Sequence, residues 1–332
     1  MWTSLTNRRM APELAARIEA SVRGRSSVAG RGVFAPRLVA VLRLGLLLLV
    51  AGLASSFVFF KHRDRDELEQ TRRALLDTVR AQGSSLTAED RGAITRVESW
   101  LTRSSGPYEG DLVSSELRAP SALGTLLANP VLYIRGPIEA FTSPAGIAKA
   151  SATSAKDALL LCLLEPPAPR TEKVLLGKVR AAYSGGAPME LRTANVRRLH
   201  EAQAGLPLLL PPWEERVQSA QEPRELARLA RELEKAPIEN AKKAVRAGLL
   251  LFAMDEPDKG GGPTELDGER AHEVRIGLVD MAASRVLLRI RRPVDPGWIS
   301  LASRAEYASG LDGCALALDV HASVAQPSPL PR

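Results

Sequence analysis

The chain of 332 residues is poor in the residues that most enzyme chemistry uses. It has two cysteines, four histidines and only 4% aromatic residues. It contains no His-Glu-x-x-His pair, no Cys/His cluster with zinc spacing, no Gly-x-Ser-x-Gly and no Gly-rich loop followed by Gly-Lys-Ser/Thr. We therefore predict that the protein is not an enzyme, and we assign no catalytic residue, cofactor or metal.

The net positive charge is concentrated at the N-terminus. Residues 1–43 hold eight Arg and two Glu, which gives +6 of the total net charge of +7, so the rest of the chain carries only +1. A nucleic-acid-binding domain would need a basic stripe on its own surface. We therefore expect no nucleic acid partner.

One long apolar run is present, at Leu38–Phe60, with Arg43 as its single charged residue. As a helix it would be about 35 Å long, against a hydrocarbon core of about 30 Å. The alternatives are a buried core helix and a cleaved signal peptide, whose apolar core would run for only about 7–15 residues. The length favours a transmembrane helix, with the lipid bilayer as its partner.

The flanking charges predict the orientation of this helix. Five Arg and no acidic residue lie between Ala20 and Arg43, which favours a cytoplasmic N-terminus, although six basic residues on the other side, Lys61–Arg80, oppose it. Residues 1–37 are expected to be a largely disordered Arg-rich tail, with a membrane-surface helix at Pro12–Val22 as the alternative. Small residues in the apolar run could let two such helices pack closely, so homo-oligomerisation stays an open alternative.

A helical juxtamembrane stalk is expected over residues 61–105. Asp64–Ala81 should continue the helix, and Thr87 resembles an N-cap. The apolar residues Ile94, Val97 and Leu101 then follow with helical spacing. Ser104–Gly110 should be a loop.

Residues 106–325 are expected to form one extracytoplasmic α+β domain with a mixed sheet. Predicted strands are Val131–Arg135, Asp157–Glu165, Arg246–Asp255 and a hairpin of Val274–Met281 with Val286–Arg292. Predicted helices are Gly146–Lys156, Thr171–Tyr183, Glu190–Ala204, Glu222–Ala247 (interrupted at Pro237), Trp298–Ser309 and, from conflicting signals, Leu311–Val320. The apolar runs at 157–165 and 246–255 suit buried strands joined by a parallel crossover. Residues 326–332 should be a disordered tail.

The hairpin alternates apolar and polar residues, and it places Arg275, Arg289 and Arg291 on one wet face. Its sequence, with Leu278-Val279-Asp280, a short turn and Val286-Leu287, is similar to paired strands in small α+β domains of bacterial envelope assembly proteins. The resemblance covers about 20 residues, and its pattern is common to amphipathic hairpins. It implies an envelope domain and assigns no functional residue.

Three groups of residues are candidate sites. His200, His272 and His321 are scattered, so structural roles are favoured. The acidic segment 255–269 contains six carboxylates around a Gly-rich centre, but its spacing misses a calcium-binding loop, which favours a solvated loop over a cation site. Cys162 and Cys314 either form one disulfide that closes a loop of about 150 residues or remain two buried thiols.

The features together predict a single-pass membrane-anchored protein with a non-catalytic extracytoplasmic domain, in the periplasm of a bacterial envelope, that binds a protein partner or acts as a scaffold. The alternative is an anchored ligand-binding or sensor domain. Such a domain would need a pocket beside the sheet, with the acidic segment and the Pro-rich break near Trp213 as candidate rims. An enzyme with an unrecognised site is the third class.

Overall fold

The computed structural model describes residues 36–119, 121–154, 157–184, 193–257, 271–303 and 312–325. The chain divides into two compact units, Met1–Glu67 and Leu68–Arg332, and helix α2 (Pro36–Gly83) contributes residues to both. No helix in these described ranges is both long and apolar enough to cross a bilayer. The transmembrane helix expected at 38–60 stays a prediction, and the alternative helix at Pro12–Val22 lies outside the described residues.

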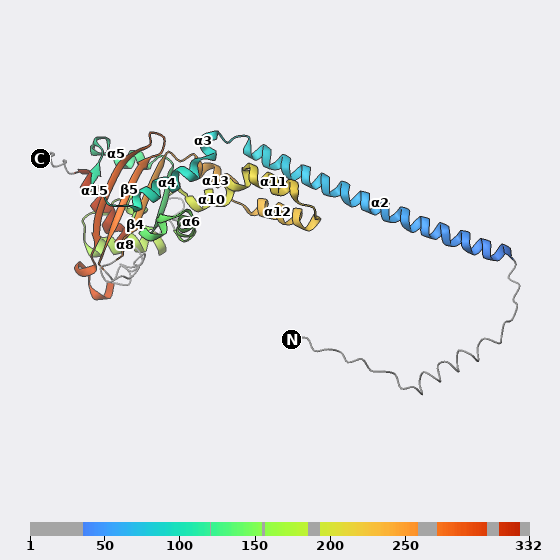
Figure 1. The fold of residues 1–332 in the computed structure, drawn as a ribbon. Coiled ribbons are helices and arrows are strands. Elements are labelled where there is room, and N and C mark those ends of the chain that lie inside the picture. The colour runs from blue at the N-terminus through green and yellow to red at the C-terminus, as the bar shows by residue number, and fades with distance from the viewer. Residues whose placement is uncertain are drawn as a thin grey trace, which may run out of the picture. The chain divides into compact units, whose positions relative to one another are not determined.

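The second unit is built on a six-stranded mixed sheet (Figure 1). Its spatial order is β1 (Leu112–Val113), β6 (Arg285–Val294), β5 (His272–Asp280), β4 (Leu249–Asp255), β2 (Val131–Pro137) and β3 (Val196–Arg198). Strands β4, β2 and β3 are parallel, whereas β1, β6, β5 and β4 pair in antiparallel fashion. The predicted mixed α+β class is confirmed.

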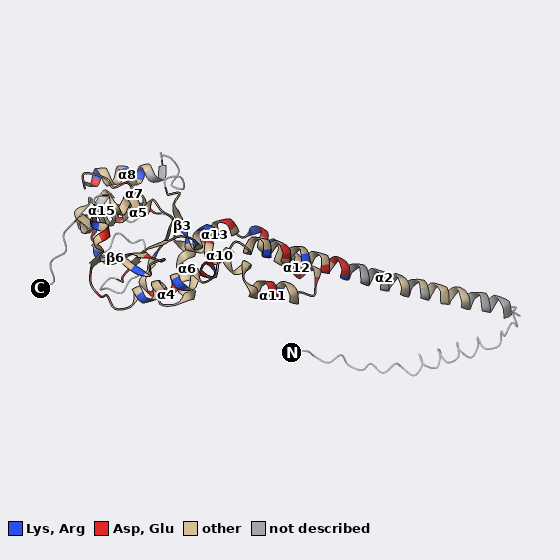
Figure 2. Ribbon diagram, turned by 90° about the horizontal axis from the view of Figure 1, so that it is seen from above, with Lys and Arg blue, Asp and Glu red and all other residues tan. Residues whose placement is uncertain are grey.

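Helices cover both faces of the sheet, with α5, α7, α8 and α15 on one side and α4 and α6 on the other (Figure 2). Side chains alternate between the two faces, so that Leu251 of β4 packs with the first group and its neighbour Phe252 with the second. This two-sided burial explains why β2 and β4 are almost continuously apolar. The first group comprises α5 (Ala122–Leu127), α7 (Ala158–Leu164), α8 (Glu172–Ser184) and α15 (Asp312–Ala325).

More helices lie on the side of the second face, and they come from the chain before β1, the segment after β2 and the chain between β3 and β4. They are α3 (Ala88–Arg91), α4 (Ala93–Ser105), α6 (Pro144–Thr153), α10 (Leu199–Gly205), α11 (Pro211–Ser219), α12 (Pro223–Lys235) and α13 (Ile238–Val245). Val79 of α2 and Val97 and Leu101 of α4 are buried in the same apolar cluster as Phe252. The segment expected as a stalk therefore contributes to the core of the domain from Leu68 onward.

Several predicted elements are confirmed. Thr87 caps α3 with the reciprocal hydrogen bonds of a capping box, in which Asp90 accepts from the Thr87 backbone. The strands at 131–137 and 249–255, the hairpin β5–β6, and the helices α6, α8, α12, α13 and α15 all lie where the sequence placed them. Arg275 pairs with Arg291 across the hairpin, and Arg289 pairs with Gly277, so the three arginines do share one face.

The segment Asp157–Glu165 was predicted as a central strand, and this prediction is wrong. Asp157 is the N-cap of helix α7, its carboxylate accepts a hydrogen bond from Leu160 N (3.3 Å), and all but the last residue of α7 is buried. A helix covered on every side is as uniformly apolar as a buried strand, so periodicity could not separate the two. The parallel crossover exists, but it connects β2 to β3 and β4.

Three further predictions need correction. The helix expected at Glu190–Ala204 contains strand β3 at Val196–Arg198, and of the described residues 193–204 only those of α10 are helical. The Pro-rich break at Leu206–Trp213 holds a 3₁₀ turn, η3 (Leu206–Leu209), and the start of α11, since proline is favourable in a first helical turn. Trp298–Ser309 shows only the 3₁₀ turns η4 (Pro296–Trp298) and η5 (Leu301–Ser303) before the described residues end at 303. The remaining 3₁₀ turns are η1 (Ser115–Arg118) and η2 (Ile138–Thr142).

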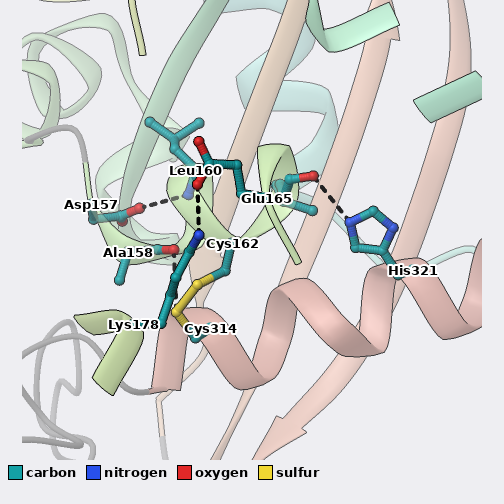
Figure 3. The surroundings of a disulfide bond; sticks show 9 residues. Asp157, Ala158, Leu160, Cys162, Glu165, Lys178, Cys314 and His321 are labelled. Carbon is teal, nitrogen blue, oxygen red and sulfur yellow. Dashed lines mark hydrogen bonds and ion pairs between the residues drawn. A yellow bond between two sulfur atoms is a disulfide. The ribbon is translucent and has the colours of Figure 1, made fainter. Parts of the chain in front are cut away.

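Cys162 of α7 and Cys314 of α15 form a disulfide, with their Cα atoms 5.1 Å apart (Figure 3). Of the two alternatives left open by the sequence, the disulfide is the one the structure contains. The helices approach closely because residue 313 is glycine, where a Cβ would lie 2.8 Å from the Leu159 backbone nitrogen. The bond links residues 152 positions apart and fixes α15 to α7.

Replacing both cysteines with alanine should lower the free energy of unfolding by about 2–5 kcal/mol, because the crosslink no longer restricts the unfolded chain. Urea unfolding of the full-length protein measures the change. Reductant should bring the wild type to the stability of the double variant and leave the variant unaffected. Equal unfolding midpoints of the oxidised wild type and the double variant would contradict the crosslink.

Candidate functional site: a buried arginine cluster and an apolar pocket

A cluster of charged residues surrounds Arg135 at the carboxyl end of the parallel strands. The Arg135 guanidinium makes a bidentate ion pair with Asp255, with Nη2–Oδ1 2.9 Å and Nε–Oδ2 3.2 Å. The same Nη2 lies 2.8 Å from Asp312 Oδ2, and Nη1 lies 3.8 Å from Asp157 Oδ2. The Tyr133 hydroxyl donates to Asp157 (2.7 Å), and His272 Nε2 lies 3.3 Å from Asp255 Oδ1.

The fold explains why these residues meet. Tyr133 and Arg135 alternate with Ile134 on β2 and so face the α7–α15 side, as does Asp255 on β4. Asp157 and Asp312 begin α7 and α15, where a carboxylate is favourable near the positive end of a helix. Each of the four elements therefore contributes one charged residue to the same point.

Burial has opposite outcomes for two of these carboxyl groups. It raises the pKa of Asp157 above its usual value, although Arg135 and the Tyr133 hydroxyl oppose the shift. Burial acts in the same direction on Asp255, but the charge of Arg135 and hydrogen bonds from His272 and Arg135 outweigh it and lower the pKa. Burial works against the charged form of Arg135, yet its carboxylate neighbours raise its pKa well above the ordinary value.

The cluster is a poor candidate for catalysis. The side chains of Arg135, Asp255 and Asp312 are 8%, 0% and 6% exposed, and the guanidinium is engaged by all three carboxylates. A substrate would have to displace these partners to reach a polar atom. We assign the cluster to fixing α7 and α15 on the sheet.

A separate pocket of about 220 Å³ opens on the other face of the sheet, between the hairpin and the end of α4. Its floor is apolar and comes from three strands: Phe252 of β4, Ile276 and Val279 of β5, and Val286 and Leu288 of β6. Its rim is formed by α4 and the following loop, through Trp100, Arg103, Ser104, Pro107, Tyr108 and Glu109, and by Arg275 and Arg289 of the hairpin.

Gly277 shapes this floor. It is the cross-strand partner of Phe252, and a Cβ at this position would lie 2.1 Å from the far end of the phenyl ring. The missing side chain therefore lets the ring lie across β5. This is the position in the hairpin at which only glycine accommodates the neighbouring strand's aromatic residue.

Ion pairs occupy most of the charged groups around the rim. Arg275 pairs with Glu256 and donates to the carbonyl oxygens of Ser104 (3.2 Å) and Gly106, which closes the C-terminal end of α4. Arg289 pairs with Glu109 and donates to Gly110 O (2.9 Å). Arg103 makes no ion pair with any described residue, and its guanidinium lies 4.9 Å from the centre of the Trp100 ring.

The candidates named from sequence lie in different places. Asp255 and His272 belong to the buried cluster, and Glu256 pairs with Arg275 and Arg291. The rest of the acidic segment, from residue 258, lies outside the described residues. His200 is exposed on α10, and His321 Nε2 lies 3.0 Å from Leu163 O. Among the residues that the structure describes, no three or more His, Cys, Asp or Glu side chains are arranged to hold a metal ion.

Trp213, beside the candidate rim in the Pro-rich break, is buried in the helical side of the core and does not line the pocket between α4 and the hairpin. Sequence reasoning also missed Arg135 and Arg103. A usable signal for Arg135 was present: one arginine ends an otherwise apolar strand, and aspartates flank the apolar runs near 157 and 255. No comparable signal marks Arg103, since one arginine on an amphipathic helix is common.

No known protein family model, curated protein or solved structure matches this chain. The pocket and the cluster are therefore interpreted from their own geometry.

Asp255→Asn and Asp157→Asn should change stability in opposite ways. Because the pKa of Asp255 is lower in the folded protein than in the unfolded chain, its carboxylate stabilises the fold at pH values above the unfolded pKa of about 3.9. This stabilisation is lost as the pH falls through the pKa of the folded state. Asp255→Asn should therefore destabilise the protein by about 3–5 kcal/mol at pH 7, and by less below pH 4.

The raised pKa of Asp157 has the reverse consequence. Its carboxyl group contributes fully to the stability of the fold at pH values below its pKa in the unfolded chain, and this stability is lost as the pH rises through its pKa in the folded protein. Asp157→Asn keeps a side-chain oxygen for capping and should be at least as stable as the wild type at pH 7. Urea unfolding at several pH values measures both variants. Equal losses at pH 7 would contradict this assignment.

Gly277→Ala should cost about 1–3 kcal/mol of stability, because the added methyl group forces the Phe252 ring off the strand. Gly177→Ala on α8 is the matched control, since no atom lies within 4 Å of its added Cβ and alanine favours helix. Thermal unfolding followed by circular dichroism compares them. A Gly277→Ala variant as stable as Gly177→Ala would show that the ring position is not constrained.

Proposed function

We propose that this protein is a single-pass, membrane-anchored binding protein of a bacterial envelope, with a cytoplasmic N-terminus and a non-catalytic extracytoplasmic domain. The binding site is the pocket between α4 and the β5–β6 hairpin. Of the two binding classes that the sequence suggested, a ligand-binding domain has more support than a scaffold for a large protein partner.

The anchor is supported by exposed leucines in the first unit. Leu46, Leu47, Leu48, Leu49 and Val50 are consecutive residues of α2, and each is between 54% and 67% exposed. Five consecutive helical residues point in all directions around the axis. Apolar exposure around a whole helix is unfavourable in water and favourable in lipid.

The orientation is supported by the disulfide between Cys162 and Cys314. Disulfides persist in oxidising compartments such as the periplasm and are rare in the cytosol. A domain that carries this bond after an apolar run is best accommodated on the outer side of the membrane, which agrees with the five arginines before the run. This disulfide is the observation that carries the proposed topology.

The binding role is supported by the surface of the second unit. Its described residues include only Leu112 and Trp298 as exposed large hydrophobic side chains, which provides little apolar area for a large protein interface. The pocket instead combines an apolar floor with a few polar groups, as small-molecule sites do. The carboxylates of the Arg135 cluster are engaged within the fold, which supports a role without catalysis.

The topology can be tested in cells that express the full-length protein with a C-terminal epitope. We expect alkaline carbonate to leave the protein in the membrane fraction, and protease added to intact spheroplasts to digest the domain. A variant with residues 38–60 deleted should lose membrane association. Release of the full-length protein by carbonate would contradict the anchor, and digestion only after the inner membrane is opened would contradict the orientation.

A further inference from the structure

We infer that the pocket binds a small ligand with an apolar body and one anionic group, with the body on the strand floor and the anionic group at Arg103. This inference rests on the proposed binding function and specifies its ligand class. It follows from the chemistry of the pocket and from the way charges are paired around it.

The floor selects an apolar body. Phe252, Val279 and Val286 face the pocket from three neighbouring strands, and Gly277 keeps the Phe252 ring against the sheet. The volume of about 220 Å³ accommodates one ring or a short acyl chain. It is below the usual range for drug-sized ligands, about 300–1,000 Å³, which argues against a folded protein or a nucleic acid as occupant.

The rim selects an anion. Three guanidinium groups, from Arg103, Arg275 and Arg289, line the pocket, against one carboxylate, from Glu109. Glu109 is engaged by Arg289, and Arg275 is engaged by Glu256 and by carbonyl oxygens at the end of α4. A cationic ligand would meet surplus positive charge, whereas a carboxylate would find a guanidinium without an ionic partner.

Arg103 is that guanidinium. It is exposed at the rim, has no ion pair with a described residue, and lies over the Trp100 ring one turn earlier on α4. The planar ring holds the guanidinium by a cation–π contact and leaves its N–H groups free to donate to an anion. A carboxylate is the anion that matches the planar fork of arginine.

The test compares two probes of nearly equal shape, 4-phenylbutyrate and its neutral amide, 4-phenylbutyramide. Ligand-observed NMR titrations would use the full-length protein in phosphatidylcholine nanodiscs, with empty nanodiscs as the blank. We expect both probes to bind the wild type, and the carboxylate to bind more tightly. Arg103→Gln should weaken 4-phenylbutyrate by about tenfold or more and leave the amide unchanged.

Two further variants separate the possible results. Arg96→Gln, on α4 but outside the pocket, is the matched charge control and should bind both probes like the wild type. Val286→Trp should fill the pocket and weaken both probes by more than tenfold. Circular dichroism would confirm that each variant is folded, and Arg103 is exposed, so its replacement does not depend on core packing.

Failure of both probes to bind the wild type, or binding unaffected by Val286→Trp, would overturn the pocket and with it the proposed binding function. Equal binding of the two probes, or an Arg103→Gln variant that binds 4-phenylbutyrate like the wild type, would overturn the anionic ligand class and leave the pocket standing. Equal losses in Arg96→Gln and Arg103→Gln would also overturn the assignment to Arg103.

Discussion

The domain depends on the charge balance around Arg135. A guanidinium buried between a sheet and two helices is stable only where carboxylates surround it, and Asp157, Asp255 and Asp312 come from α7, β4 and α15. The cluster therefore joins the centre of the sheet to both helices of one face. Any arrangement that moved one of these helices away would leave a buried charge without its partner, so the cluster specifies one packing of that face.

The disulfide reinforces the same contact between α7 and α15. Each helix begins with an aspartate of the Arg135 cluster and carries a cysteine within its next turns, Cys162 and Cys314. The ionic contact and the covalent one therefore act on the same pair of helices, with Gly313 allowing their close approach. The C-terminal helix, far from α7 in sequence, is held at two points that are close together in space.

The sequence predicted elements whose residues carry a local signal. The hairpin alternates with period two, Thr87 and Asp90 form a recognisable cap, and β4 is an apolar run of strand length. It failed at α7, because a helix buried on all sides loses its periodicity, and at β3, whose three residues are too few to show one. The pocket was not predictable, because it joins residues of α4 to strand residues more than a hundred positions away. The members of the Arg135 cluster carried a local signal, but their meeting depends on packing between β2, β4, α7 and α15.

The pocket follows from where α4 ends. Arg275 binds the carbonyl oxygens of Ser104 and Gly106, so the helix stops over the middle of the hairpin and the chain turns toward Tyr108. Val279 and Val286, nearer the hairpin turn, line the space between the hairpin and Trp100 and Arg103 of α4. The Arg275 guanidinium is occupied by these carbonyl oxygens, whereas Arg103, in the last turn of α4, lines the pocket. One arginine thus shapes the cavity, and the other is available to a ligand.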